Sequence, residues 1–194
     1  MTHSRAWLMV LTLALLVGCA GTPSPSNRYT LPSESVEATP LVSGATRHTL
    51  LLRPVRVAHY LNSDGIILQL DDITLNQARE HLWAEDISRQ LERGLRQRLS
   101  SRLPDTRVLG DGTPDAEALV LRVDVVRFQG HHDGFAVASG EWQLRNQRGE
   151  LLALEPFEAV TELDADGYPA LVRALGRSWS QVADGMASRI AGLR

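Results

Sequence analysis

The stretch LVLRVDVVRFQGHHDGFAVASGEWQL, residues 119–144, decides the fold of this chain. Leucine or valine occupies every second position from residue 119 to 125, and the polar side chains of Arg122 and Asp124 lie between them. A similar alternation of small or apolar with polar residues returns in residues 136–144. This period of two predicts strands with one buried face. Because a short glycine-bounded segment, residues 130–134, separates the two runs, we predict a β-hairpin.

The sequence after the hairpin predicts a third strand. Residues 146–149 have the composition of a tight turn, and a β-rich segment follows in residues 151–163. Pro156 interrupts this segment. Because proline lacks the N–H group that a central strand donates, the segment needs a bulge or an edge position there. The three strands together predict an antiparallel meander.

Shorter β-rich segments precede the hairpin. Residues 28–31 predict a short first strand, and residues 49–58 predict a strand that Pro54 places at an edge or divides by a bulge or a break. Residues 66–70 alternate with a period of two, and residues 73–76 either extend that strand or pair with it. We expect all of these strands to join one sheet.

Two segments have helical periodicity. From Trp83 to Leu103 a large apolar residue recurs at every fourth position, and Pro104 follows, so we predict an amphipathic helix of about twenty residues. A second apolar stripe occupies residues 171–190, with Pro169 near its start, where a missing donor costs little. The predicted fold class is α+β: a two-layer domain in which a mostly antiparallel twisted sheet is covered by two long amphipathic helices.

The N-terminus carries a targeting signal. A polar start with Arg5 precedes an apolar segment, residues 6–17, which is shorter than the about 20 residues that a membrane-spanning helix needs. The segment ends in Leu-Val-Gly-Cys, residues 16–19, with the only cysteine of the chain. Such a lipobox predicts removal of residues 1–18 and lipidation of Cys19. The alternatives are an ordinary signal peptide with a chance cysteine, or a buried structural thiol.

The residues around the predicted anchor indicate where the protein works. Position 20 is alanine, and the absence of an aspartate there favours the outer membrane over the inner membrane. Residues 19–27 contain two prolines and little apolar surface, so we predict a flexible lipidated tether, followed by one domain in residues 28–194. Two acyl chains already hold a protein stably on a membrane, so the chain is expected to stay there, facing the periplasm.

Charge and cysteine content exclude several classes of protein. The predicted signal holds one of the 20 basic residues and none of the 23 acidic ones, so the mature chain has a formal charge of −4. This charge argues against nucleic acid as a partner. With a single cysteine that is expected to carry lipid, disulfides cannot stabilise the fold.

The sequence predicts no catalytic, cofactor-binding or metal site. It contains no Gly-x-Ser-x-Gly and no Gly-x-x-x-x-Gly-Lys motif, so serine esterase and P-loop readings lack their first requirement. His131, His132 and Asp133 are adjacent possible ligands. However, neighbouring strand residues point to opposite faces, and zinc needs three or four convergent ligands. We therefore expect polar residues exposed in a turn and no bound metal.

Other polar and aromatic sets have structural explanations. Aspartates in expected turns or helix caps are explained by capping and solvation: Asp71, Asp72, Asp164 and Asp166. Arginines on the first helix, interspersed with glutamates, predict a solvated face of mixed charge rather than a headgroup site: Arg89, Arg93 and Arg96. Tryptophans on predicted core faces are expected in the core, with lipid contact as the alternative: Trp83, Trp142 and Trp179.

The order and spacing of several short motifs resemble the ABC-type transport auxiliary lipoproteins, in particular the PqiC/YmbA group. The motifs are the lipobox, Tyr29-Thr30-Leu31-Pro32, Pro54-Val55 with Tyr60-Leu61, Trp83-Ala84-Glu85, residues 121–128 before a glycine turn, Trp142 and the alanine-rich last helix. The resemblance covers nearly all of the mature chain.

The resemblance implies a non-enzymatic lipoprotein of an MCE-type intermembrane lipid transport system. Its implied partners are a periplasmic tunnel protein of MCE domains, the integral inner-membrane subunit of that system, and further copies of the chain, with a ring as one form of homo-oligomer. Only Cys19 receives a role from the family. The preferred function is docking of the tunnel to the outer membrane. The alternative is a tethered periplasmic lipid carrier, which needs its own apolar cavity.

Overall fold

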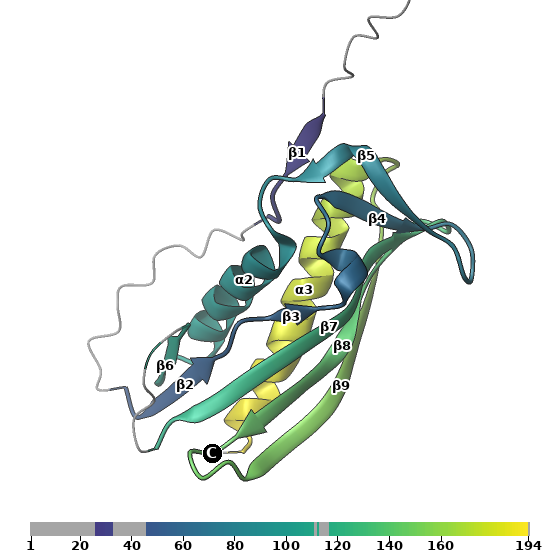
Figure 1. Ribbon diagram of the computed structural model, residues 1–194. Helices are drawn as coiled ribbons and strands as arrows, with labels where there is room; N and C mark the ends of the chain where they lie inside the picture. The colour runs from purple at the N-terminus through teal and green to yellow at the C-terminus, as the bar shows by residue number, and fades with distance from the viewer. Residues whose placement is uncertain (1–25, 33–45, 111, 113–116, 194) are drawn as a thin grey trace, which may run out of the picture.

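The computed structural model describes residues 26–32, 46–110, 112 and 117–193 (Figure 1). The predicted signal peptide, the lipidation site Cys19 and all but the last two residues of the predicted tether lie outside the described residues. The predictions for these segments therefore stay predictions.

Three long strands form the meander that the alternating sequence predicts. They are β7 (Leu119–His131), β8 (Phe135–Arg145) and β9 (Leu151–Glu162), and β8 pairs antiparallel with both neighbours. Gly134 adopts a positive φ of 86° in the turn between β7 and β8, a conformation that glycine adopts without strain. In the described sheet, β9 pairs only with β8, so Pro156 lies on an edge strand, where its missing N–H group costs no ladder bond.

The opposite edge of β7 is covered by three short strands in succession. They are β2 (His48–Leu52), β3 (Arg56–Val57) and β4 (Gly65–Gln69), and each pairs parallel with a different part of β7. Pro54 falls in the gap between β2 and β3, so the predicted break is confirmed. A 3₁₀ turn, His59–Leu61, follows β3.

Three further strands complete a mixed sheet of nine strands. β5 (Leu75–Trp83) is antiparallel to β4, β1 (Asn27–Tyr29) is parallel to β5, and β6 (Thr106–Leu109) is parallel to β2. The long pairings of the sheet are antiparallel, as expected, but most of the short ones are parallel, and β6 was not predicted. The α+β fold class is confirmed.

The first helix begins later than the sequence predicts. α2 (Ile87–Arg102) is 16 residues long, and Trp83 is the last residue of β5. The carboxylate of Asp86 accepts a hydrogen bond from the N–H of Ser88, which caps the helix at this point. Trp83 satisfied the helical spacing because its side chain is buried in the same core as the helix residues. The second helix, α3 (Tyr168–Ala191), contains the predicted stripe and has proline in its first turn.

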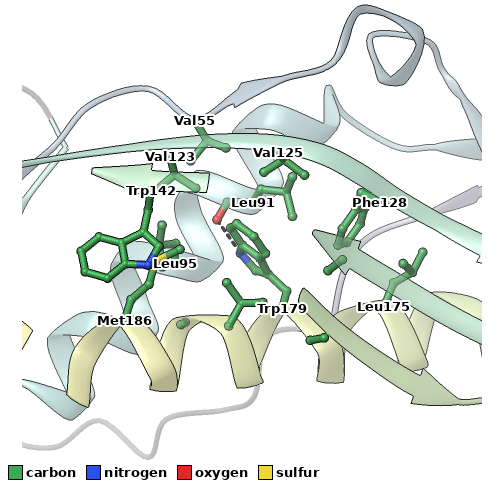
Figure 2. Close-up of a cluster of buried hydrophobic side chains, with 14 of the residues drawn as sticks. Val55, Leu91, Leu95, Val123, Val125, Phe128, Trp142, Leu175, Trp179 and Met186 are labelled. Carbon is green, nitrogen blue, oxygen red and sulfur yellow. Dashed lines mark hydrogen bonds between the residues drawn. The ribbon is translucent and has the colours of Figure 1, made fainter. Parts of the chain in front are cut away.

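Both helices lie on the same side of the sheet, and α3 runs along β7, β8 and β9 (Figure 1). The indole N–H of Trp179 on α3 donates to the carbonyl of Leu91 on α2, over 2.9 Å (Figure 2). The same ring makes an edge contact with Phe128 of β7. Trp83, Trp142 and Trp179 are all buried, which confirms their prediction as core residues.

Candidate functional site

Several hydrogen bonds join β1, the first described strand, to the neighbouring strand β5. The guanidinium of Arg28 donates to the carbonyl of Trp83 over 3.3 Å, and the hydroxyl of Tyr29 lies 2.9 Å from Nδ1 of His81. The other contact of the His81 ring is a stack on Tyr168 at the start of α3, with centroids 3.9 Å apart. The residues after the predicted tether are therefore coupled to both layers of the domain.

The residues after β1 cross the seam between the two helices. The N–H of Leu31 donates to the buried side chain of Gln90 on α2, over 2.8 Å, and the amide of Gln90 donates to the carbonyl of Glu85. Pro32 then lies against Gly176 of α3, where a Cβ atom would come within 2.9 Å of the proline Cδ. Only a glycine lets the backbone approach the helix this closely.

A groove lies between α2 and α3 beside this crossing. The enclosed space in it is about 50 Å³, and the rest of the groove is open to solvent. Trp179 and Leu31 contribute apolar surface, but Arg93, Gln97 and Arg98 line it as well. The groove suits a polar or mixed ligand surface better than an acyl chain, which is enclosed by apolar side chains in lipid carriers.

One carboxylate bridges the two helices near their C-terminal ends. Asp184 of α3 accepts from Arg98 of α2 over 2.7 Å at both carboxylate oxygens, and from Arg102 over 2.8 and 2.9 Å. The hydrogen bond from Arg98, with that from Arg102, lowers the pKa of Asp184 to about 2. Nothing in the local sequence marks this cluster, because Asp184 is more than 80 residues away from both arginines.

The histidine turn is arranged differently from our expectation. The rings of His131 and His132 stack with centroids 4.4 Å apart, and their Nδ1 atoms lie 3.3 and 2.9 Å from carboxylate oxygens of Asp133. The alternation argument is wrong here because β7 ends at His131 and His132 already belongs to the turn. One ligand atom from each residue lies within 4.8 Å of the others. These are three possible ligands in a turn, and the imidazoles of His131 and His132 both lie against the carboxylate of Asp133.

Asp71 and Arg93 have the structural roles that we predicted, whereas Asp164 forms an ion pair in place of a cap. Asp71 accepts from two backbone N–H groups of its own turn, and the bond from Ile73 lowers the pKa of Asp71. The carboxylate of Asp164 pairs with an arginine of α3 over 2.8 Å. Arg93 pairs with Glu85 over 2.8 Å and lowers the pKa of that carboxyl group, as expected for a mixed-charge face.

The structure also gathers apolar side chains that the sequence analysis did not single out. Ile73 stands at the tip of the β4–β5 hairpin, flanked by Leu70 and Leu75, and all three are exposed. Phe135, also exposed, begins β8 at the neighbouring turn. The sequence signal is an apolar residue between the turn residues Asp72 and Thr74, where polar residues prevail.

The family model for the ABC-type transport auxiliary lipoprotein component matches residues 29–187, which is most of the described domain. This chain belongs to the ABC-type transport auxiliary lipoproteins. The resemblance stated from its short motifs is thereby confirmed. The family is one of transport auxiliary proteins and not a class of enzymes.

Named members of the family are similar over nearly the whole chain. The intermembrane transport lipoprotein PqiC of Escherichia coli strain K12 is 32% identical over 186 residues, which cover 96% of this chain and 97% of that protein. The PqiC protein of Shigella flexneri matches to the same extent. At most eight residues of this chain fall outside the match, so Cys19 lies within the matched span.

Two solved structures have the same fold as this transport auxiliary lipoprotein. A crystal structure of an uncharacterized protein has 31% sequence identity and a TM-score of 0.75, and the match covers 86% of this chain and 99% of the other. A crystal structure from Xanthomonas campestris has 16% identity and a TM-score of 0.64 over 87% of this chain and 94% of the other, which shows the fold alone. Among the described residues of this family member, no helix is long and apolar enough to cross a membrane.

Proposed function

We propose that this chain is an outer-membrane-anchored, periplasm-facing lipoprotein of an MCE-type intermembrane lipid transport system. In this proposal the chain docks the periplasmic tunnel of MCE domains to the outer membrane. The integral inner-membrane subunit of the system delivers lipid to the other end of that tunnel. The supporting observation is similarity to PqiC, an intermembrane transport lipoprotein, over a span that includes Cys19. The proposed anchor is the acylated Cys19, after removal of residues 1–18, and residues 19–27 form the tether.

The groove between the helices supports docking over the alternative of a tethered lipid carrier. A carrier encloses acyl chains in an apolar cavity with an entrance. The groove is open to solvent and has Arg93 and Arg98 in its lining. A second hollow, of about 360 Å³ between α3 and β9, is also open to solvent, and Glu155 and Glu158 contribute to its lining. We also propose that the chain has no catalytic or metal-dependent activity and requires no cofactor.

Docking to a tunnel built of rings favours a homo-oligomer of this chain. A closed ring of copies presents one contact surface to each repeat around the tunnel. Several weak contacts then act together, and avidity raises the affinity about a hundredfold or more. Closure needs two different surfaces on each copy. The unpaired edge of β9 is one available surface, since its outer row of N–H and C=O groups has no partner strand in the described sheet.

The test is purification of the intact lipoprotein from membranes, followed by native mass spectrometry with the cognate MCE tunnel protein. We expect the lipidated mass at Cys19, a mass that is a multiple of one chain, and recovery of the tunnel protein in the same complex. A strict monomer that does not associate with the tunnel, even on a lipid surface, contradicts docking and supports the carrier.

A further inference from the structure

Four exposed apolar side chains lie in or beside two hairpin turns at one end of the sheet. Leu70, Ile73 and Leu75 belong to the β4–β5 hairpin, and Phe135 belongs to the β7–β8 hairpin. Ile73 is 87% exposed, more than any other large apolar side chain in the described part of the chain. Single exposed apolar residues are common on protein surfaces, but a group of them marks a surface for contact.

The β4–β5 turn is built to hold Ile73 outward. The carboxylate of Asp71 accepts from the N–H groups of Ile73 and Thr74, over 2.9 and 2.6 Å. These bonds close the turn and leave the isoleucine side chain at its apex. The side chain adds nothing to the packed core at this position, because it is almost fully exposed. Its apolar character therefore has no explanation within the fold.

Hydrogen bonds and strand pairing link the two hairpins next to their turns. The N–H of His132 donates to the carbonyl of Gln69 over 2.9 Å, and the side-chain amide of Gln129 donates to the Gln69 side chain over 2.8 Å. β4 also pairs directly with the end of β7, where Gln69 lies opposite His131. These bonds fix the turn of one hairpin relative to the turn of the other.

The length of the predicted tether lets the hairpin tips approach the membrane that holds the proposed anchor. β1 runs parallel to β5 with Asn27 opposite His81, so the chain arrives from the side of β5 that leads to Leu75. From His81 to Leu75 is six residues, about 20 Å at the rise of a strand. The eight residues from Cys19 to Asn27 reach at most about 28 Å. The hairpin tips are thus within reach of a bilayer that holds Cys19.

We propose that Ile73, with Leu70, Leu75 and Phe135, contacts the surface of the bilayer in which the chain is anchored. This inference rests on the proposed lipid anchor at Cys19. Asp71, Asp72 and Asp133 lie beside the apolar tips, so the surface repels anionic headgroups and suits a zwitterionic lipid surface. The contact fixes the orientation of the domain, because the anchor alone leaves it free to turn.

The test compares two variants of the intact lipoprotein, Ile73→Cys and Gln147→Cys, each with one introduced cysteine, in phosphatidylcholine vesicles. Both positions are exposed turn residues, and Gln147 follows the far end of β8, about 35 Å from the β7–β8 turn. Lipid on Cys19 blocks its thiol, so a maleimide dye labels only the introduced cysteine. Spin-labelled phosphatidylcholine then reports how close each dye is to the bilayer.

We expect quenching of the dye at position 73 to exceed quenching at position 147 at least twofold, and to weaken when a third of the lipid is phosphatidylglycerol. Equal quenching at the two positions overturns the contact, even if the protein stays on the vesicles. Shielding of the dye at position 73 in detergent without a bilayer, increasing with protein concentration, also overturns it and indicates a second copy of the chain. Labelling of the parent protein at Cys19 contradicts the anchor itself, which is a different failure.

Discussion

Replacement of Asp184 by asparagine tests whether the bridge between α2 and α3 stabilises the domain. The variant keeps the size of the side chain and removes the charge that Arg98 and Arg102 share. Because the pKa of Asp184 falls from 3.8 to about 2, the ionised bridge contributes at most about 2.5 kcal/mol to the free energy of unfolding. The side chain is 33% exposed, and solvent screening reduces this to about 1–1.5 kcal/mol.

The dependence of this loss on pH is specific. A carboxyl group with a lowered folded-state pKa stabilises the protein fully above its unfolded pKa, and the contribution disappears as the pH falls through the folded pKa. The difference between the parent protein and Asp184→Asn is therefore constant from pH 7 to about pH 5, and it shrinks between pH 4 and pH 2. Urea unfolding of the mature chain and of the variant at several pH values measures this difference in the free energy of unfolding.

A matched control separates this effect from a general loss of negative charge. Glu141→Gln removes a carboxylate from an exposed position of β8, and we expect a change within about 0.5 kcal/mol. The reasoning is refuted if Asp184→Asn changes the free energy of unfolding no more than this control. It is refuted equally if the loss has the same size at pH 3 as at pH 7.

Three further predictions address the anchor, the histidine turn and the sheet. Cys19→Ala should leave an uncleaved precursor, and a normal mature mass with outer-membrane fractionation for this variant contradicts the lipid anchor. Simultaneous replacement of His131 and His132 by alanine should change the free energy of unfolding by no more than about 0.5 kcal/mol. If the parent protein contains stoichiometric zinc and this variant does not, the proposal that the protein binds no metal is contradicted. Gly140→Ala should destabilise the domain by about 3 kcal/mol or more, because the new Cβ atom overlaps the carbonyl oxygen of Asp124 on β7. A melting temperature equal to that of the parent protein contradicts this close approach of the two strands.

The meander and the helical stripes were predictable because their signals are local. Alternation in β7 and β8 depends on which face of one strand is buried, and the turn residues that join the strands are adjacent in sequence. Pro54 and Pro156 marked a break and an edge because a missing N–H group restricts the sheet wherever it occurs. The core positions of the three tryptophans followed from the same periodicities.

Errors arose where two patterns gave the same spacing. Trp83 fits the stripe of the first helix, yet it ends β5, because a buried residue satisfies either period over one turn. The helix start at Ile87 depends on the cap that Asp86 provides. His131 and His132 come together because the strand ends between them, and alternation no longer applies beyond that point.

The sequence by itself determined the fold class, the family and the candidate lipidation site Cys19, because each is written in residues that lie close together along the chain. Tertiary structure alone decided the parallel pairing of β2, β3 and β4 along β7, and the joining of Asp184 to two arginines. It also decided which exposed apolar residues share one end of the sheet. The physical reason is that contacts between distant segments depend on how helices and strands pack, and local periodicity carries no record of that packing.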